Sequence, residues 1–126
     1  MEIYAPHNDY NLKDLFEALR VKQWIKNLII PAVGFAMLDA NSNKYIEITN
    51  IFFGFIAFCI GSSCIYILND IMDAPKDRAH PVKCNRPIAS GRIGTSFLFG
   101  LLAALCPVSV FIASMANSNI AVIVLI

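Results

Sequence analysis

Residues 69–92 read NDIMDAPKDRAHPVKCNRPIASGR, a charged stretch between two long apolar segments. It holds three carboxylates, Asp70, Asp73 and Asp77, and five cationic side chains. The cations are Lys76, Arg78, Lys83, Arg86 and Arg92. Each flanking segment has about the 20 apolar residues that a membrane-crossing helix needs. Residues 69–95, which we call the polar segment, are therefore predicted to join two membrane helices and to carry the functional site.

The composition is too apolar for a soluble domain of this size. Of 126 residues, 57% are hydrophobic and 15% are charged, where soluble domains carry about 25% charged residues. The net charge of +1 and the mixing of cations with carboxylates exclude a nucleic-acid binder, which needs a strongly basic face. We predict an integral membrane protein embedded in the lipid bilayer.

The apolar segments predict an all-α, polytopic transmembrane helical bundle over residues 1–126. The expected spans are 24–38, 48–68, 96–116 and the start of a fourth at 120–126. The first is interrupted by Pro31 and Gly34. The last covers only about 10 Å at 1.5 Å per residue, so we expect a truncated chain or a fragment.

The sequence before the first span predicts a short amphipathic helix on the membrane surface. From Asn11 onward, apolar residues follow a helical spacing. They are Leu12, Leu15, Phe16 and Leu19. A cationic cluster with Trp24 follows at residues 20–27, a composition typical of the membrane interface. An ordinary interfacial anchor is as good an interpretation of this cluster as a binding site.

Lysine and arginine are distributed very unevenly among the connections between the predicted spans. Four precede or begin the first span, and five lie in the polar segment. Only Lys44 lies in the connection between the first two spans. Because cytoplasmic connections carry the excess of basic residues, the N-terminus and the polar segment are both predicted to be cytoplasmic.

On a helix, Asp70, Asp73 and Asp77 would fall within an arc of roughly 60°. Carboxylates on one stripe repel one another unless a cation lies between them, and Mg²⁺ is the hard ion that suits carboxylates and phosphates together. The alternative is local pairing with neighbouring cations in a solvated loop. Pro75 lacks an N–H and predicts a kink or a restart between Asp73 and Asp77.

Two groups of motifs resemble the UbiA superfamily of intramembrane prenyltransferases. The first aspartate-rich motif of that superfamily resembles Asn69-Asp70-x-x-Asp73-x-x-x-Asp77 followed by Arg86-Pro87-Ile88-x-Ser90-Gly91. The decaprenyl-phosphate phosphoribosyltransferase branch is most similar. The motifs are Arg20-x-Lys22-Gln23-Trp24-x-Lys26-Asn27 and Asp77-Arg78-Ala79-His80-Pro81-x-Lys83-x-x-Arg86-Pro87-Ile88-Ala89-x-Gly91. Pro75 departs from the pattern of the family.

The resemblance implies a fold of about nine transmembrane helices in two similar halves, of which this chain covers the first half, in the bacterial cytoplasmic membrane. It implies transfer of 5-phosphoribose from phosphoribosyl diphosphate to a polyprenyl phosphate. Asp70, Asp73 and Asp77 would be the catalytic residues that hold Mg²⁺. The substrate-binding residues would be Asn69, Arg78, Lys83 and Arg86 for the donor, and Lys22, Gln23, Lys26 and Asn27 for the lipid phosphate.

Two other functions remain open from the sequence. A UbiA-type prenyltransferase would move a polyprenyl group from its diphosphate to an aromatic acceptor, with the same metal and the same stripe. A non-catalytic membrane fragment would only bind Mg²⁺ or anionic headgroups. The donor separates the first two, and a downstream second aspartate motif would separate an enzyme from a fragment.

Overall fold

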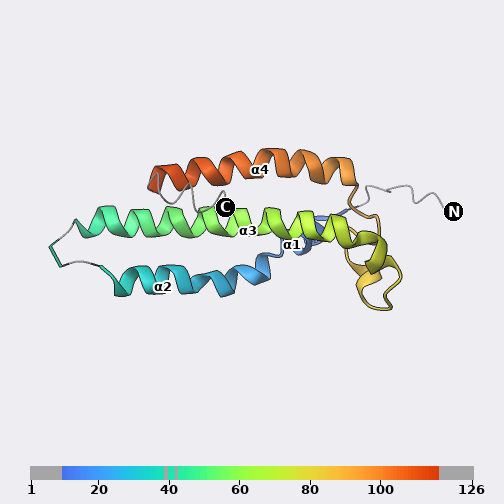
Figure 1. The fold of residues 1–126 in the computed structure, drawn as a ribbon, viewed down its shortest axis with the longest axis horizontal. Coiled ribbons are helices and arrows are strands. Elements are labelled where there is room, and N and C mark those ends of the chain that lie inside the picture. The colour runs from blue at the N-terminus through green and yellow to red at the C-terminus, as the bar shows by residue number, and fades with distance from the viewer. Residues whose placement is uncertain (1–9, 39, 42, 117–126) are drawn as a thin grey trace. The chain divides into compact units, whose positions relative to one another are not determined.

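The computed structural model describes residues 10–38, 40–41 and 43–116, and within them every regular element is helical (Figure 1). The elements are α1 (Leu12–Ala18), the 3₁₀ helix η1 (Val21–Leu28), α2 (Ile29–Ala36), α3 (Lys44–Arg78), the 3₁₀ helix η2 (Lys83–Asn85) and α4 (Thr95–Ala116). The all-α prediction is confirmed. The fourth predicted span, 120–126, lies outside the described residues.

Helix α1 begins at a capping box. The Asn11 side chain accepts a hydrogen bond from the Asp14 N–H, and the Asp14 carboxylate accepts one from the Asn11 N–H. These two bonds satisfy donors that the start of a helix leaves unpaired. The short helix is thus where the apolar spacing predicted it, but its buried residues are Asp14 and Ala18, while Leu12 and Phe16 are exposed.

Two helices, α3 and α4, are long and apolar enough to cross a membrane, and they contain the predicted spans 48–68 and 96–116. Helix α3 continues past residue 68 to Arg78, so the first ten residues of the polar segment are helical. It also runs through Pro75 without a restart. Pro75 has no N–H to donate to the Ile71 carbonyl, so α3 lacks one backbone hydrogen bond in its last turns.

The predicted first span, 24–38, falls on two short elements. The 3₁₀ helix η1 takes residues up to Leu28, and α2 begins at Ile29. Pro31 lies in the first turn of α2, where an N–H has no intrahelical partner, so the proline is tolerated there. A full crossing by this segment stays a prediction.

The chain divides into two compact units. One contains Met1–Lys22 and Ser63–Ala104, and the other contains Gln23–Ser62 and Leu105–Ile126. In the second unit, Ser109 Oγ on α4 donates a hydrogen bond of 2.8 Å to the Ala57 carbonyl on α3. Both residues are almost fully buried, and such polar contacts between helices substitute for the missing hydrophobic drive inside a bilayer.

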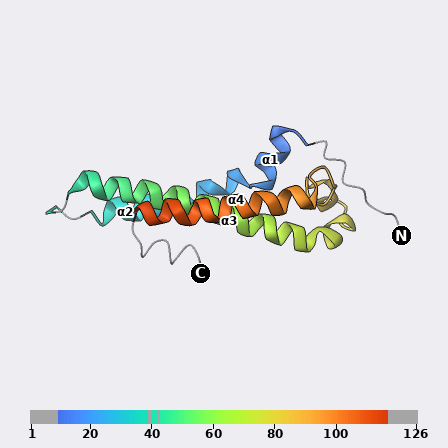
Figure 2. The same cartoon turned by 90° about the horizontal axis from the view of Figure 1, so that it is seen from above.

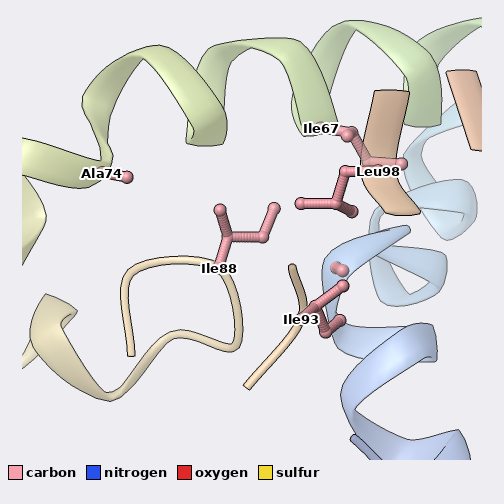
Figure 3. Close-up of a cluster of buried hydrophobic side chains, with 6 residues drawn as sticks. Ile67, Ala74, Ile88, Ile93 and Leu98 are labelled. Atoms are coloured by element: carbon pink, nitrogen blue, oxygen red, sulfur yellow. The ribbon is translucent and has the colours of Figure 1, made fainter. Parts of the chain in front are cut away.

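The first unit has a small apolar core between α1, the end of α3, the start of α4 and the connection that joins α3 to α4. Its buried members are Ala18, Ile67, Ala74, Ile88, Ile93 and Leu98. Figure 3 shows Ile88, from the connection, between Ala74 of α3 and Leu98 of α4. The connection folds compactly at the end of these helices (Figure 2). Its apolar residues therefore anchor the polar segment to both helices.

Candidate functional site

The last three turns of α3 carry the predicted carboxylates, and these differ in burial. Asp70 is 8% exposed and Asp77 is 5% exposed, and both lie near the buried positions Ile67 and Ala74. Helical spacing explains this, because residues 67, 70, 74 and 77 follow one another at three and four positions. Asp73 lies at the edge of that stripe and is exposed. Two of the three predicted carboxylates thus face the interior of the first unit.

Two arginines from distant parts of the chain neutralise the buried carboxylates. Arg20 binds Asp70 through two hydrogen bonds, Nη2 to Oδ1 at 2.6 Å and Nε to Oδ2 at 3.3 Å. Arg86 Nη1 lies 3.0 Å from Asp77 Oδ2 and 3.6 Å from Asp70 Oδ1. Buried charge requires such partners, and the arginine fork is suited to carboxylates. Arg86 therefore links both aspartates into one network.

Two further residues of α3, Ser63 and Tyr66, contact the chain around Arg20 and hold it near Asp70. The Ser63 Oγ donates a hydrogen bond of 2.6 Å to the Leu19 carbonyl, which docks the end of α1 against α3. The Arg20 backbone adopts φ 51°, in the left-handed region that non-glycine residues rarely occupy. Its guanidinium carbon lies 4.8 Å from the centre of the Tyr66 ring, a cation–π contact.

Arg86 is held by the folded connection after α3. The Arg78 Nε donates to the Ala89 carbonyl at 3.0 Å, and the Ser90 N–H donates to the Arg86 carbonyl at 2.8 Å. Gly91 adopts φ 77°, which a side chain would strain. The segment that carries Arg86 is therefore tied to the end of α3 and closed by a tight turn.

A second ion pair joins this connection to α1. Arg92 Nε lies 3.3 Å from Asp14 Oδ1, and Arg92 Nη2 donates to the Asn85 carbonyl at 3.0 Å. Asp14 is 7% exposed and also caps α1. Sequence reasoning missed the roles of Asp14 and Arg20, because nothing local to either residue shows a partner more than 45 positions away.

The other predicted donor-binding residues lie at the surface around this network. Asn69, Arg78 and Lys83 are exposed. His80 is also exposed, and its Nδ1 accepts hydrogen bonds from the backbone N–H groups of Val82 and Lys83 at 3.1 and 3.2 Å. His80 thus stabilises the turn after α3.

The predicted acceptor-binding residues lie on η1. Lys22 and Lys26 are exposed, whereas Gln23 and Asn27 are partly buried. Within the second unit, the Asn27 side-chain amide donates to Ser62 Oγ at 3.3 Å and to Cys59 Sγ at 3.5 Å on α3. The Asn27 amide therefore donates to side chains of α3. The lipid-phosphate site on η1 stays a prediction.

The carboxylates suit a magnesium ion in their chemistry and partly in their placement. Among the described residues, no three acidic, histidine or cysteine side chains are grouped closely enough to hold a metal ion. Asp70 and Asp77, however, both face the single cationic nitrogen Arg86 Nη1. Two carboxylate ligands that converge on one cationic position, with substrate phosphates as further ligands, are what a protein magnesium site commonly offers.

Comparison with known proteins identifies the family. The sequence model of the UbiA prenyltransferase family matches residues 28–126. The chain belongs to the UbiA prenyltransferase family. No solved structure matches the chain significantly.

Several curated relatives of this UbiA chain share one name, decaprenyl-phosphate phosphoribosyltransferase. The Corynebacterium glutamicum protein is 38% identical over 113 residues, which is 88% of this chain and 34% of that protein. The Mycolicibacterium smegmatis protein is 34% identical over 111 residues, and the Mycobacterium tuberculosis protein is 30% identical over 112 residues. The chain spans about a third of the length of these relatives. The resemblance predicted from the motifs is confirmed.

Proposed function

We propose that the complete gene product is a magnesium-dependent membrane transferase that moves 5-phosphoribose from phosphoribosyl diphosphate to a polyprenyl phosphate. Membership of the UbiA family supports the transferase class. The name shared by relatives that match 86 to 88% of this chain supports the phosphoribosyl donor and the polyprenyl phosphate acceptor. The observation that supports the proposal most is the network in which the partly exposed Arg20 and Arg86 pair with the buried Asp70 and Asp77 at the end of a long apolar helix.

This network suits an anionic donor at a membrane surface. Asp70 and Asp77 are buried, and ionisable groups buried inside a membrane protein are costly, paired with one another and usually functional. Arg20 and Arg86 each keep about a third of the side chain exposed, at 27% and 34%, so a diphosphate can reach both guanidiniums. Arginine binds phosphate through two parallel hydrogen bonds. Arg78, Lys83 and Asn69, exposed nearby in the sequence, would extend this site along the donor.

The reaction breaks the bond between C1 of the ribose and the diphosphate oxygen, and the diphosphate leaves with the electron pair. A new bond forms between C1 and an oxygen of the lipid phosphate. Asp70 and Asp77, with Asp73 as a third candidate, would hold Mg²⁺, which when bound neutralises the charge of the leaving diphosphate. Arg20 and Arg86 would orient the diphosphate and share its negative charge.

The polyprenyl phosphate acceptor has to be bound by the protein but does not have to be deprotonated by it. A phosphate monoester is already ionised at neutral pH, so no general base is required to make it a nucleophile. Lys22, Gln23, Lys26 and Asn27 on η1 are the residues proposed to bind the lipid phosphate. Exposed lysines near an apolar helix are suited to a headgroup phosphate.

The membrane arrangement forms part of the same proposal. The protein would cross the bilayer several times, with its N-terminus and the polar segment on the cytoplasmic side. Nine of the ten lysines and arginines fall on those two stretches, and such an excess marks the cytoplasmic connections of membrane proteins. The donor would then bind from the cytoplasm.

Donor competition tests the proposal and separates it from the prenyltransferase alternative. The complete gene product in detergent is incubated with Mg²⁺, a polyprenyl phosphate and ribose-labelled phosphoribosyl diphosphate, and label is measured in the organic phase. We expect lipid-bound label that unlabelled phosphoribosyl diphosphate suppresses and an allylic diphosphate does not. Transfer of a labelled polyprenyl group to an aromatic acceptor, with no ribose transfer, would assign the alternative instead.

A further inference from the structure

Arg20 occupies a strained backbone position within the first unit. Among the described residues, it is the one non-glycine residue with a positive φ, at 51°. A side chain in this region is disfavoured by contact with its own backbone, and such strain persists only where surrounding contacts impose it. The Ser63 hydrogen bond to the Leu19 carbonyl supplies one of these contacts immediately before Arg20.

The side chain of Arg20 has a dedicated position on α3. Ser63, Tyr66 and Asp70 lie three and four residues apart, and therefore on one face of that helix. Ser63 holds the neighbouring carbonyl, Tyr66 lies beneath the guanidinium at 4.8 Å, and Asp70 binds it through both oxygens. Three contacts from one helix face place this cation against one carboxylate.

This placement conflicts with metal binding at Asp70. Arg20 Nη2 lies 2.6 Å from Oδ1 and Arg20 Nε lies 3.3 Å from Oδ2. The Asp70 side chain is 10% exposed, so little of the carboxylate is open to a second cation. A magnesium ion and a guanidinium at the same carboxylate also repel each other, and more strongly in a partly buried site than in water.

Of the two arginines near Asp70, Arg20 is better suited than Arg86 to move away from this carboxylate. Arg86 has a second, closer carboxylate partner, with Nη1 at 3.0 Å from Asp77 and 3.6 Å from Asp70. Arg20 contacts no other carboxylate in the described part of the chain. Its side chain is 27% exposed, so it has a route toward a ligand in solvent. Arg86 can therefore remain on Asp77 while Arg20 moves.

We propose that Arg20 is an exchangeable counter-ion of Asp70, which neutralises this carboxylate in the free protein and releases it when a metal ion binds together with a diphosphate. The released guanidinium then binds the diphosphate. This inference rests on the proposed function, because it assumes a metal–diphosphate ligand. It predicts that Arg20 weakens the binding of metal alone and strengthens the binding of diphosphate with metal.

The test measures two binding affinities of the complete gene product in detergent. Mn²⁺ alone is titrated and followed by electron paramagnetic resonance, and inorganic diphosphate is titrated in the presence of Mg²⁺ and followed by calorimetry. Arg20→Gln removes the charge. Arg20→Gly also removes it and relieves the left-handed backbone, which guards against misfolding. The matched control is Lys76→Gln, which removes an exposed cation from α3.

We expect both Arg20 variants to bind Mn²⁺ alone about tenfold more tightly and inorganic diphosphate about tenfold more weakly, within the usual range of coupling between two ligands. Lys76→Gln should change neither affinity by more than about threefold, since Lys76 forms no ion pair in the described part of the chain and its exposed charge is screened by solvent. If the Arg20 variants bind Mn²⁺ no better than Lys76→Gln does, the inference is overturned while the metal site stands. If the wild type binds neither Mn²⁺ alone nor inorganic diphosphate in the presence of Mg²⁺, the metal role in the proposed function fails as well.

Discussion

Replacing Arg86 by methionine should destabilise the protein by leaving Asp77 without its arginine. Arg86 Nη1 lies 3.0 Å from Asp77 and 3.6 Å from Asp70, and the two carboxylate side chains are 7% and 10% exposed. Loss of one partner from a fully buried ion pair costs about 3 to 5 kcal/mol. The Arg86 side chain is 34% exposed, so water screens the pair, and we expect about 1 to 3 kcal/mol.

A double-mutant cycle separates the ion pair from the packing of the arginine. Equilibrium unfolding of the complete gene product is measured in mixed micelles for Arg86→Met, Asp77→Asn and the double variant. Because the double variant leaves no unpaired charge at position 77, its loss should be smaller than the sum of the single losses by about 1 to 2 kcal/mol. Additive losses would refute the pairing, and so would a loss for Arg86→Met no larger than that for Lys76→Gln.

Two further predictions concern backbone and helix contacts. Ser109→Ala removes the buried hydrogen bond to the Ala57 carbonyl and should lower the free energy of unfolding by about 0.5 to 1.5 kcal/mol. Ser114→Ala, an exposed residue bonded within its own helix turn, should be nearly neutral in the same unfolding measurement, and equal losses would contradict the interhelical role. Gly91→Ala places a side chain at φ 77° and should lower the free energy of unfolding by about 1 to 2 kcal/mol. Gly100→Ala, in α4 with open space around it, should be neutral or stabilising, and the opposite order would refute the assignment of strain to Gly91.

The sequence predicted the parts of the fold that depend on local composition. The uninterrupted apolar runs at 48–68 and 96–116 correspond to α3 and α4, because a charge-free segment of that length has few alternatives to a helix. The apolar spacing after Asn11 likewise predicted α1. Element ends were predicted less well. Charge suggested that a connection begins at residue 69, but α3 continues to Arg78, since its buried aspartates have arginine partners.

The candidate site was predicted in its residue types and only partly in its geometry. The spacing of Asp70, Asp73 and Asp77 indicated one stripe, yet burial separates Asp73 from the other two. The pairing of Arg20 with Asp70 joins residues 50 positions apart. Such a contact depends on how α1 docks against α3 through Ser63, and no local pattern in the sequence encodes that docking.

Ribose transfer by Asp70→Asn tests the proposed role of the buried carboxylate most directly. Asparagine keeps the shape of the side chain but removes the charge that the account assigns to arginine pairing and metal binding. With the complete gene product, Mg²⁺, labelled phosphoribosyl diphosphate and a polyprenyl phosphate, the account predicts label in the lipid for the wild type and for Glu17→Gln, an exposed carboxylate on α1. It predicts a loss of at least about 100-fold for Asp70→Asn. Ribose transfer by Asp70→Asn at the rate of Glu17→Gln would show that the Asp70 charge is not needed for the reaction.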